Sequence, residues 1–220
     1  MKLYKSRKIR GHWHFDNSKG IYDYENSPYA EILDVLKIVL EELVTSKMLI
    51  PRKIQGIESV LKYNTVDELI DQIVKSNLLE NTFEFDIIGD TIIYTNTGEE
   101  IHSGIFELNS FRTFQQCFFI STKSDVWLPM AFDEDSYSFV WNIERYNLNY
   151  QRLPNVLNKI IKLLNWESFT AEVVYNELGT LQVKSDLFLS EEIITREFNS
   201  NPNTSFNLIN YISKVSKSQI

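Results

Sequence analysis

The sequence predicts a single α+β domain in which several amphipathic helices pack on one antiparallel or mixed sheet. Three observations lead to this prediction. Apolar residues recur every three or four positions in some segments and every second position in others, which are the periods of helices and strands. Of the 220 residues, 43% are hydrophobic and 24% are charged, close to the average of globular proteins. No repeat, low-complexity tract or linker divides the chain, so residues 1–220 are interpreted as one domain.

Three segments carry the strongest helix patterns. Residues 29–43 repeat apolar side chains at helical spacing, after a serine and a proline that are typical of a helix start. Residues 65–74 begin with Thr-Val-Asp-Glu, a capping box, and continue as a single apolar stripe. Residues 149–164 form the third helix, with Pro154 in its first turn, where the missing N–H costs little.

The strand predictions depend on alternation and on turn residues. Gly89-Asp90 separates two β-rich runs and suits a type II′ turn, so residues 82–88 and 91–95 are predicted to form a hairpin. A second hairpin is expected at residues 12–15 and 21–24. Further strands are expected at residues 104–108, 114–121, 125–132, 136–143, 169–175 and 181–187, followed by a short helix at 191–198 and a frayed helix at 206–215 in a polar tail.

The charge of the chain is uneven. The first ten residues carry five basic residues and no acid, and they are interpreted as a short basic edge strand whose lysines block aggregation. The whole chain has a formal charge of −8, so the remaining residues carry −13. An acidic body repels nucleic acid and attracts basic proteins. We therefore expect a basic protein partner and no nucleic acid.

The composition also argues against several classes of protein. The single cysteine, Cys117, rules out an internal disulfide and any multi-cysteine zinc site. No apolar segment approaches the roughly 18 residues that span a bilayer, and no signal-peptide core follows the basic start. Glycine is scarce, and the phosphate-loop, dinucleotide and serine-hydrolase motifs are absent. The expectation is a cytoplasmic protein with no cofactor and no membrane partner.

Two candidate catalytic groups remain. His12 and His14 lie on one face of a predicted strand, because side chains there repeat every second residue. With His102 or Asp16 they could hold a metal ion with an open position, so a metal-assisted hydrolase is the alternative function. Cys117 is flanked by Phe and Ile, and we expect it to be buried core rather than a nucleophile.

A third candidate is an acidic and aromatic segment. Three consecutive carboxylates suit an exposed turn better than a pocket, and Tyr146 and Tyr150 follow shortly after them. Aromatic anchors rimmed by carboxylates are typical of surfaces that bind basic proteins. The predicted partner-binding residues are Asp125, Asp133, Glu134, Asp135, Tyr137 and Trp141.

One pattern within residues 117–165 resembles a known class of proteins. It consists of Ser124-Asp-Val-Trp-Leu-Pro129, then Asn147 or Asn149, then Arg152-Leu153 at the start of a helix. This resembles small cytoplasmic immunity proteins that accompany bacterial polymorphic or contact-dependent toxins. The resemblance implies a non-enzymatic protein that occludes a cognate toxin, and the acidic charge favours a basic toxin such as a nuclease. Nothing in the sequence indicates an oligomeric state.

Overall fold

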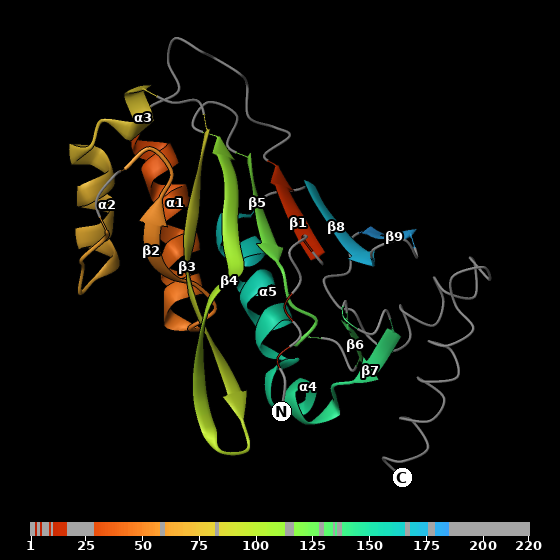
Figure 1. Cartoon of the computed structure of the whole chain (residues 1–220). Coiled ribbons are helices and arrows are strands. Elements are labelled where there is room, and N and C mark those ends of the chain that lie inside the picture. The colour runs from red at the N-terminus through yellow and green to blue at the C-terminus, as the bar shows by residue number, and fades with distance from the viewer. Residues whose placement is uncertain are drawn as a thin grey trace.

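Seven strands form one fully antiparallel sheet in the order β2-β3-β4-β5-β1-β8-β9 (Figure 1). Their bounds are β1 Gly11–Asp16, β2 Ile50–Ile54, β3 Glu84–Thr95, β4 Gly98–Arg112, β5 Cys117–Thr122, β8 Ser168–Tyr175 and β9 Gly179–Lys184. Two further strands, β6 Met130–Asp133 and β7 Ser138–Trp141, pair as a separate hairpin. This computed structural model describes residues 3, 5, 9, 11–16, 29–57, 60–81, 84–112, 117–127, 130–133, 135, 138–165, 168–175 and 179–184. The predicted α+β class with an antiparallel sheet is confirmed.

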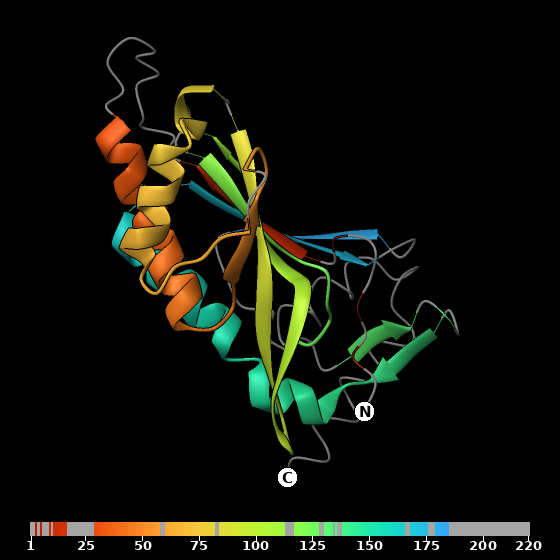
Figure 2. The same cartoon turned by 60° about the vertical axis from the view of Figure 1, so that its left-hand side comes forward.

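The larger helices cover one face of this sheet. The helices are α1 Tyr29–Thr45, α2 Val66–Lys75, α3 Leu78–Asn81, α4 Ile143–Asn149 and α5 Arg152–Leu164. Figure 2 shows α1, α2 and α5 packed on one side of the sheet, and the β6–β7 hairpin on the other side. Within the described residues, no helix has both the length and the apolar character needed to cross a membrane.

The helix starts follow local capping chemistry. Thr65 accepts a hydrogen bond from the Glu68 N–H at 3.2 Å, as the capping box predicts. The Glu68 carboxylate accepts its return bond from the N–H of Asn64, one residue earlier than in the usual motif. Pro154 is the third residue of α5 and fits its first turn. The predicted start of this helix at Asn149 is three residues early, because Asn149 ends the separate helix α4.

Several sequence predictions fall elsewhere or cannot be placed. The predicted strand at 125–132 is much shorter, since β6 begins at Met130. Residues 21–24, 191–198 and 206–215 lie outside the described residues.

Aromatic side chains tie the central strands together on the buried face. Phe15 of β1 stacks on Phe118 of β5 at 4.6 Å, and Phe118 lies 5.7 Å from Phe111 of β4. Phe111 in turn contacts Phe85 of β3, with 5.4 Å between ring centroids. All four rings are buried, with at most 1% exposed. Burial of each stabilises the fold by about 2 to 3 kcal/mol, so this row fixes the register of four neighbouring strands.

Gly89 and Asp90, which were predicted to form a hairpin turn, lie inside the continuous strand β3. That prediction is wrong, and the turn lies at Asn96-Thr97 instead. A Cβ atom at Gly89 would lie 2.0 Å from the backbone oxygen of Ile50 in β2. Glycine is required because the two backbones approach closely beside register shifts in both pairings of β3.

Replacing Gly89 with alanine tests this close approach. We expect Gly89→Ala to lower the free energy of unfolding by more than about 3 kcal/mol, because the added methyl group overlaps backbone atoms of β2. The control is Gly98→Ala, whose added Cβ meets nothing within 4 Å and only strains a φ of 129°. That strain costs about 1 to 2 kcal/mol. Urea denaturation followed by circular dichroism measures both, and equal losses would contradict the explanation.

Residues 91–95 of β3 extend beyond the part that pairs with β2. The outward backbone groups of this part bond to side chains and to the Lys47 carbonyl instead of a strand. The Asn149 amide accepts the N–H of Tyr94 at 3.0 Å and donates to the carbonyl of Tyr94 at 2.8 Å. The N–H of Ile92 donates to the carbonyl of Lys47 at 3.0 Å, and Arg152 donates to the carbonyl of Ile92 at 2.6 Å. These contacts replace a neighbouring strand.

Arg152 joins this edge to two other parts of the chain. Its guanidinium donates to the carbonyl of Ser46 at 2.9 Å, just beyond α1, and to Asn149 at 2.8 Å. It also lies 4.4 Å from the ring centroid of Tyr94 and 5.8 Å from that of Trp127. Asn149, Arg152 and Trp127 lie together here and act as one structural clamp.

The Asn149 contacts can be removed with little change of shape. We expect Asn149→Leu to cost about 3 kcal/mol, because both backbone groups of Tyr94 lose their partners in a buried place. The Tyr94 amide should also lose protection in hydrogen exchange. Asn147→Leu, on the exposed side of α4, is the control and should change stability by less than about 0.5 kcal/mol. Unchanged protection at Tyr94 would show that the clamp does not hold this edge.

Candidate functional site

Two residues of the acidic triplet, Asp133 and Asp135, lie at the β6–β7 hairpin turn. Asp133 closes β6 and is paired in register with Ser138, the first residue of β7. Asp135 lies in the intervening turn and is exposed. Two other predicted partner-binding residues, Glu134 and Tyr137, lie outside the described residues. Trp141 ends β7, but its side chain is outside what the structure describes.

Asp125 does not belong to any exposed surface. It is only 2% exposed, so the prediction that it contacts a partner is wrong. The segment folds into the core because Trp127 is buried, where its indole N–H donates to the Thr122 hydroxyl at 3.0 Å. The backbone carbonyl of Asp125 accepts a hydrogen bond from Asn142 at 3.0 Å. Asp125 therefore belongs to the structural core.

The tyrosines that follow the acidic triplet in sequence lie at a different place. Tyr146 and Tyr150 stack on one another along α4, with 4.7 Å between ring centroids. This helix begins just after the Trp141 end of β7, whereas the acidic turn lies at the opposite end of that strand. The length of β7 therefore separates the two groups, and the expected single cluster becomes two.

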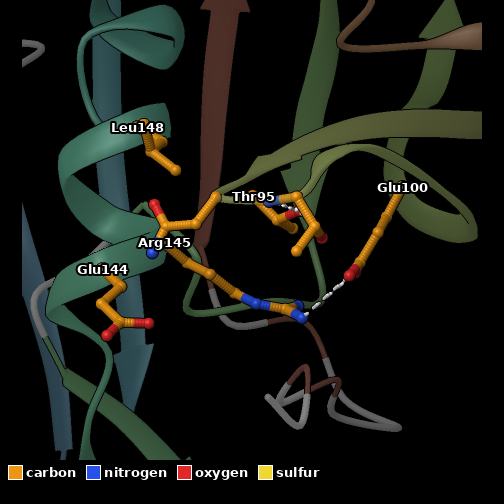
Figure 3. Close-up of a pocket in the computed structure, with 7 residues that line it drawn as sticks. Thr95, Glu100, Glu144, Arg145 and Leu148 are labelled. Carbon is orange, nitrogen blue, oxygen red and sulfur yellow. Dashed lines mark hydrogen bonds and ion pairs between the residues drawn. The ribbon is translucent and has the colours of Figure 1, made fainter.

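The exposed face of α4 borders a small hollow beside the tip of the β3–β4 hairpin. The hollow has a volume of about 160 Å³. It is lined by Thr95, Asn96, Thr97, Glu100, Glu144, Arg145 and Leu148. Figure 3 shows the Arg145 side chain running from α4 to Glu100, with Glu144 and Leu148 on the same helix. The sequence did not predict this site, because it placed the turn at Gly89-Asp90. With the turn at Asn96-Thr97, Glu100 lies opposite α4.

Ion pairs at the hollow leave negative charge accessible. The Arg145 side chain is 4% exposed and its guanidinium donates to Glu100 at 3.1 Å. The hydrogen bond from His102 lowers the pKa of the Glu100 carboxyl, and the charge of Arg145 acts in the same direction. Glu144 is exposed and forms no ion pair with any described residue. An incoming group therefore meets carboxylates at the rim, while the arginine charge lies beneath.

Exposed apolar groups lie next to these carboxylates on α4. Leu148 is 40% exposed and Tyr150 is 37% exposed. At 3.6 residues per turn, Glu144, Asn147 and Leu148 lie on one side of α4, whereas Tyr150, just past the end of the helix, lies about 160° around its axis from Leu148. We call these four residues, together with Glu100, the α4 surface. Its mixture of an aromatic ring, an aliphatic side chain and carboxylates suits the binding of a protein.

The described histidine and cysteine candidates lie on three different strands, and the side chains of His12 and Asp16 are outside what the structure describes. The ring of His14 in β1 stacks on Phe119 at 4.5 Å. His102 lies on β4, two strands away from β1, and bonds there to Glu100 of the same strand. In the part of the chain that the structure describes, no three His, Cys, Asp or Glu side chains lie close enough to hold a metal ion. Cys117 is 5% exposed in β5, as expected for core. The hydrolase alternative gains no support from this geometry.

No protein-family model, curated protein or solved structure matches the chain. A fold by itself does not determine function. The function is therefore inferred from the α4 surface and from the charge of the chain.

The ionisation of Glu100 tests the network at the hollow. We expect its carboxyl to titrate below the ordinary value of 4.5, and His102→Phe to bring the pKa back toward that value. Because the pKa is lowered in the folded state, the stabilisation is present at neutral pH and is lost as the pH falls through the folded-state value. Carbon-detected NMR measures this titration directly. A pKa unaffected by His102→Phe would contradict the assigned cause.

Proposed function

We propose that the chain is a non-enzymatic immunity protein that inhibits a cognate bacterial toxin in the cytoplasm by occluding it. The observation that carries the proposal is the α4 surface, where Glu100, Glu144 and the exposed Leu148 line a small hollow. A fully exposed leucine or tyrosine alone needs no explanation. Here Leu148 lies one helical turn after the exposed Glu144 beside the hollow, and Tyr150 follows at the end of the helix, a composition found in protein-binding patches.

The size of the hollow favours binding of a protein over binding of a substrate. Pockets for drug-sized ligands measure roughly 300 to 1,000 Å³, whereas this hollow measures about 160 Å³. Its volume is that of about five water molecules, enough for one long side chain of a partner. Glu144 and Glu100 at the rim would attract the charged end of a lysine or arginine, and Leu148 would contact its aliphatic part.

Charge supplies the second part of the mechanism. The formal charge of −8 steers a basic toxin toward this chain and raises the association rate. A nuclease is a suitable partner because its active site must attract phosphate and is therefore basic. In this scheme the acidic turn at Asp133, Glu134 and Asp135 contributes to the association rate, and Leu148 and Tyr150 contribute the anchors that slow dissociation.

Protection of cells tests the proposal. The protein encoded immediately upstream of this chain is expressed in a bacterial host, alone or together with the chain. We expect growth arrest by the neighbour alone and normal growth with the chain. The double variant Glu144→Lys/Leu148→Asp should lose protection, because it reverses the charge of Glu144 and replaces an apolar contact with a carboxylate that the partner would have to bury. A neighbour that is harmless, or protection unaffected by the double variant, would contradict the proposal or its surface respectively.

Two variants with equal changes of net charge distinguish the effect of overall charge on association from the effect of the acidic turn. Reversing Asp133, Glu134 and Asp135 to lysine should slow association with the toxin tenfold or more at low salt. Reversing Asp34, Glu41 and Asp71, three exposed acids of α1 and α2, changes the net charge equally at a distant place. Stopped-flow association rates at two salt concentrations compare the two variants. Equal slowing would show that only the net charge matters and not the acidic turn.

A further inference from the structure

Within the described part of the chain, no strand pairs with residues 98–103 of β4 on the side away from β3. β5 pairs with β4 only from Phe106 onward, and the last backbone contact before that is the bond from Lys123 to the carbonyl of Ile105. Residues 98–103 continue beyond this point as one arm of the projecting hairpin (Figure 1). Gly104, with a φ of 62°, marks the point where β4 leaves β5.

The hydrogen-bonding groups on this edge can be assigned from the opposite strand. In an antiparallel pair, two opposed residues either bond to each other or both point their backbone groups outward. Tyr94 and Ile92 point outward, since Asn149, Lys47 and Arg152 take their bonds. Their partners in β4, Glu99 and Ile101, therefore also point outward, on the other side of the hairpin.

No described residue bonds to the outward backbone groups of Glu99 and Ile101. Ser103 also points outward, and its carbonyl accepts a bond from the Lys5 side chain. A carbonyl oxygen has two lone pairs, so this bond leaves room for another. The Ile101 side chain is 65% exposed, the largest apolar group on this edge. A strand edge whose donors and acceptors bond to no described residue, and which carries an exposed isoleucine, is a template for another strand.

The order of residues along this edge complements itself. If two such edges run antiparallel with Ile101 opposite Ile101, then Glu99 faces Ser103 and Glu100 faces His102 of the other copy. The three outward residues then form three hydrogen-bonded pairs. The side chains match as well, with isoleucine on isoleucine and a carboxylate beside an imidazole. The within-chain bond of 2.9 Å between His102 and Glu100 shows that these groups are complementary.

We propose that two copies of this chain pair through the open edges of β4, antiparallel and centred on Ile101. A second copy is favoured over an unrelated strand because each acidic position on the edge meets a non-acidic one in this register. The contact is small compared with a standard interface of roughly 1,600 Å², and both copies are acidic. The dimer is therefore weak, with a dissociation constant of roughly 10 µM to 1 mM, and salt strengthens it.

Sedimentation equilibrium on the full chain tests the association. We expect reversible dimers between about 10 µM and 1 mM, with a larger dimer fraction at higher salt. Ile101→Pro removes the outward N–H that the pairing needs, and proline is tolerated on an edge strand where that group faces solvent. This variant should be folded by circular dichroism and monomeric throughout. A monomeric wild-type protein at the highest concentration would overturn the proposal.

Disulfide trapping tests the register, since the only native cysteine, Cys117, is buried. In Ile101→Cys, the two cysteines are directly opposed, with Cα atoms about 5.5 Å apart, and should form a disulfide dimer on oxidation. In Glu99→Cys, they lie four residues apart along the edge, at about 14 Å, and should not. The pair Glu99→Cys/Ser103→Cys restores trapping. Trapping of Glu99→Cys as fast as Ile101→Cys would overturn the register.

Discussion

The pairing of the outer edge of β3 by Asn149 and Arg152 is the interaction on which the lower half of the molecule depends. A strand that projects past its neighbour exposes backbone donors and acceptors, and buried groups without partners cost free energy. Here two side chains and the Lys47 carbonyl supply those partners. Because Asn149 ends α4 and Arg152 begins α5, the same bonds also fix where the two helices meet the sheet.

The hairpin that this clamp supports has two unlike edges. The β3 edge is covered by side chains, whereas no described residue bonds to the outward backbone groups of Glu99 and Ile101 on the β4 edge. The clamp also brings α4 against the hairpin tip, which forms the hollow and presents Glu144 and Leu148 to solvent. The α4 surface and the β4 edge therefore have one structural cause, which is that the β3–β4 hairpin extends beyond the neighbouring strands.

Local chemistry made the helices predictable, whereas contacts distant in sequence determined what the sequence did not predict. The capping box at Thr65 and the place of Pro154 depend on neighbouring residues, so they could be read directly. Gly89 looked like a turn residue, but its role is set by the backbone of Ile50, which lies far away in sequence. Asp125 was predicted to contact a partner, but its segment is buried together with Trp127. The candidate site was missed for the same reason, because its two halves meet only in space.

The distribution of polar groups among the described residues supports the proposed binding function. A catalytic site gathers titratable side chains in a cleft that can hold a substrate. Here the buried polar side chains with assigned bonds, such as Asn149, hold backbone groups in place. The carboxylate of Glu144 instead faces solvent beside Leu148, at a hollow too small for a typical substrate. Polar groups that stabilise the inside and unpaired groups that face outward are what a rigid binding protein requires, because its surface must be complete before the partner arrives.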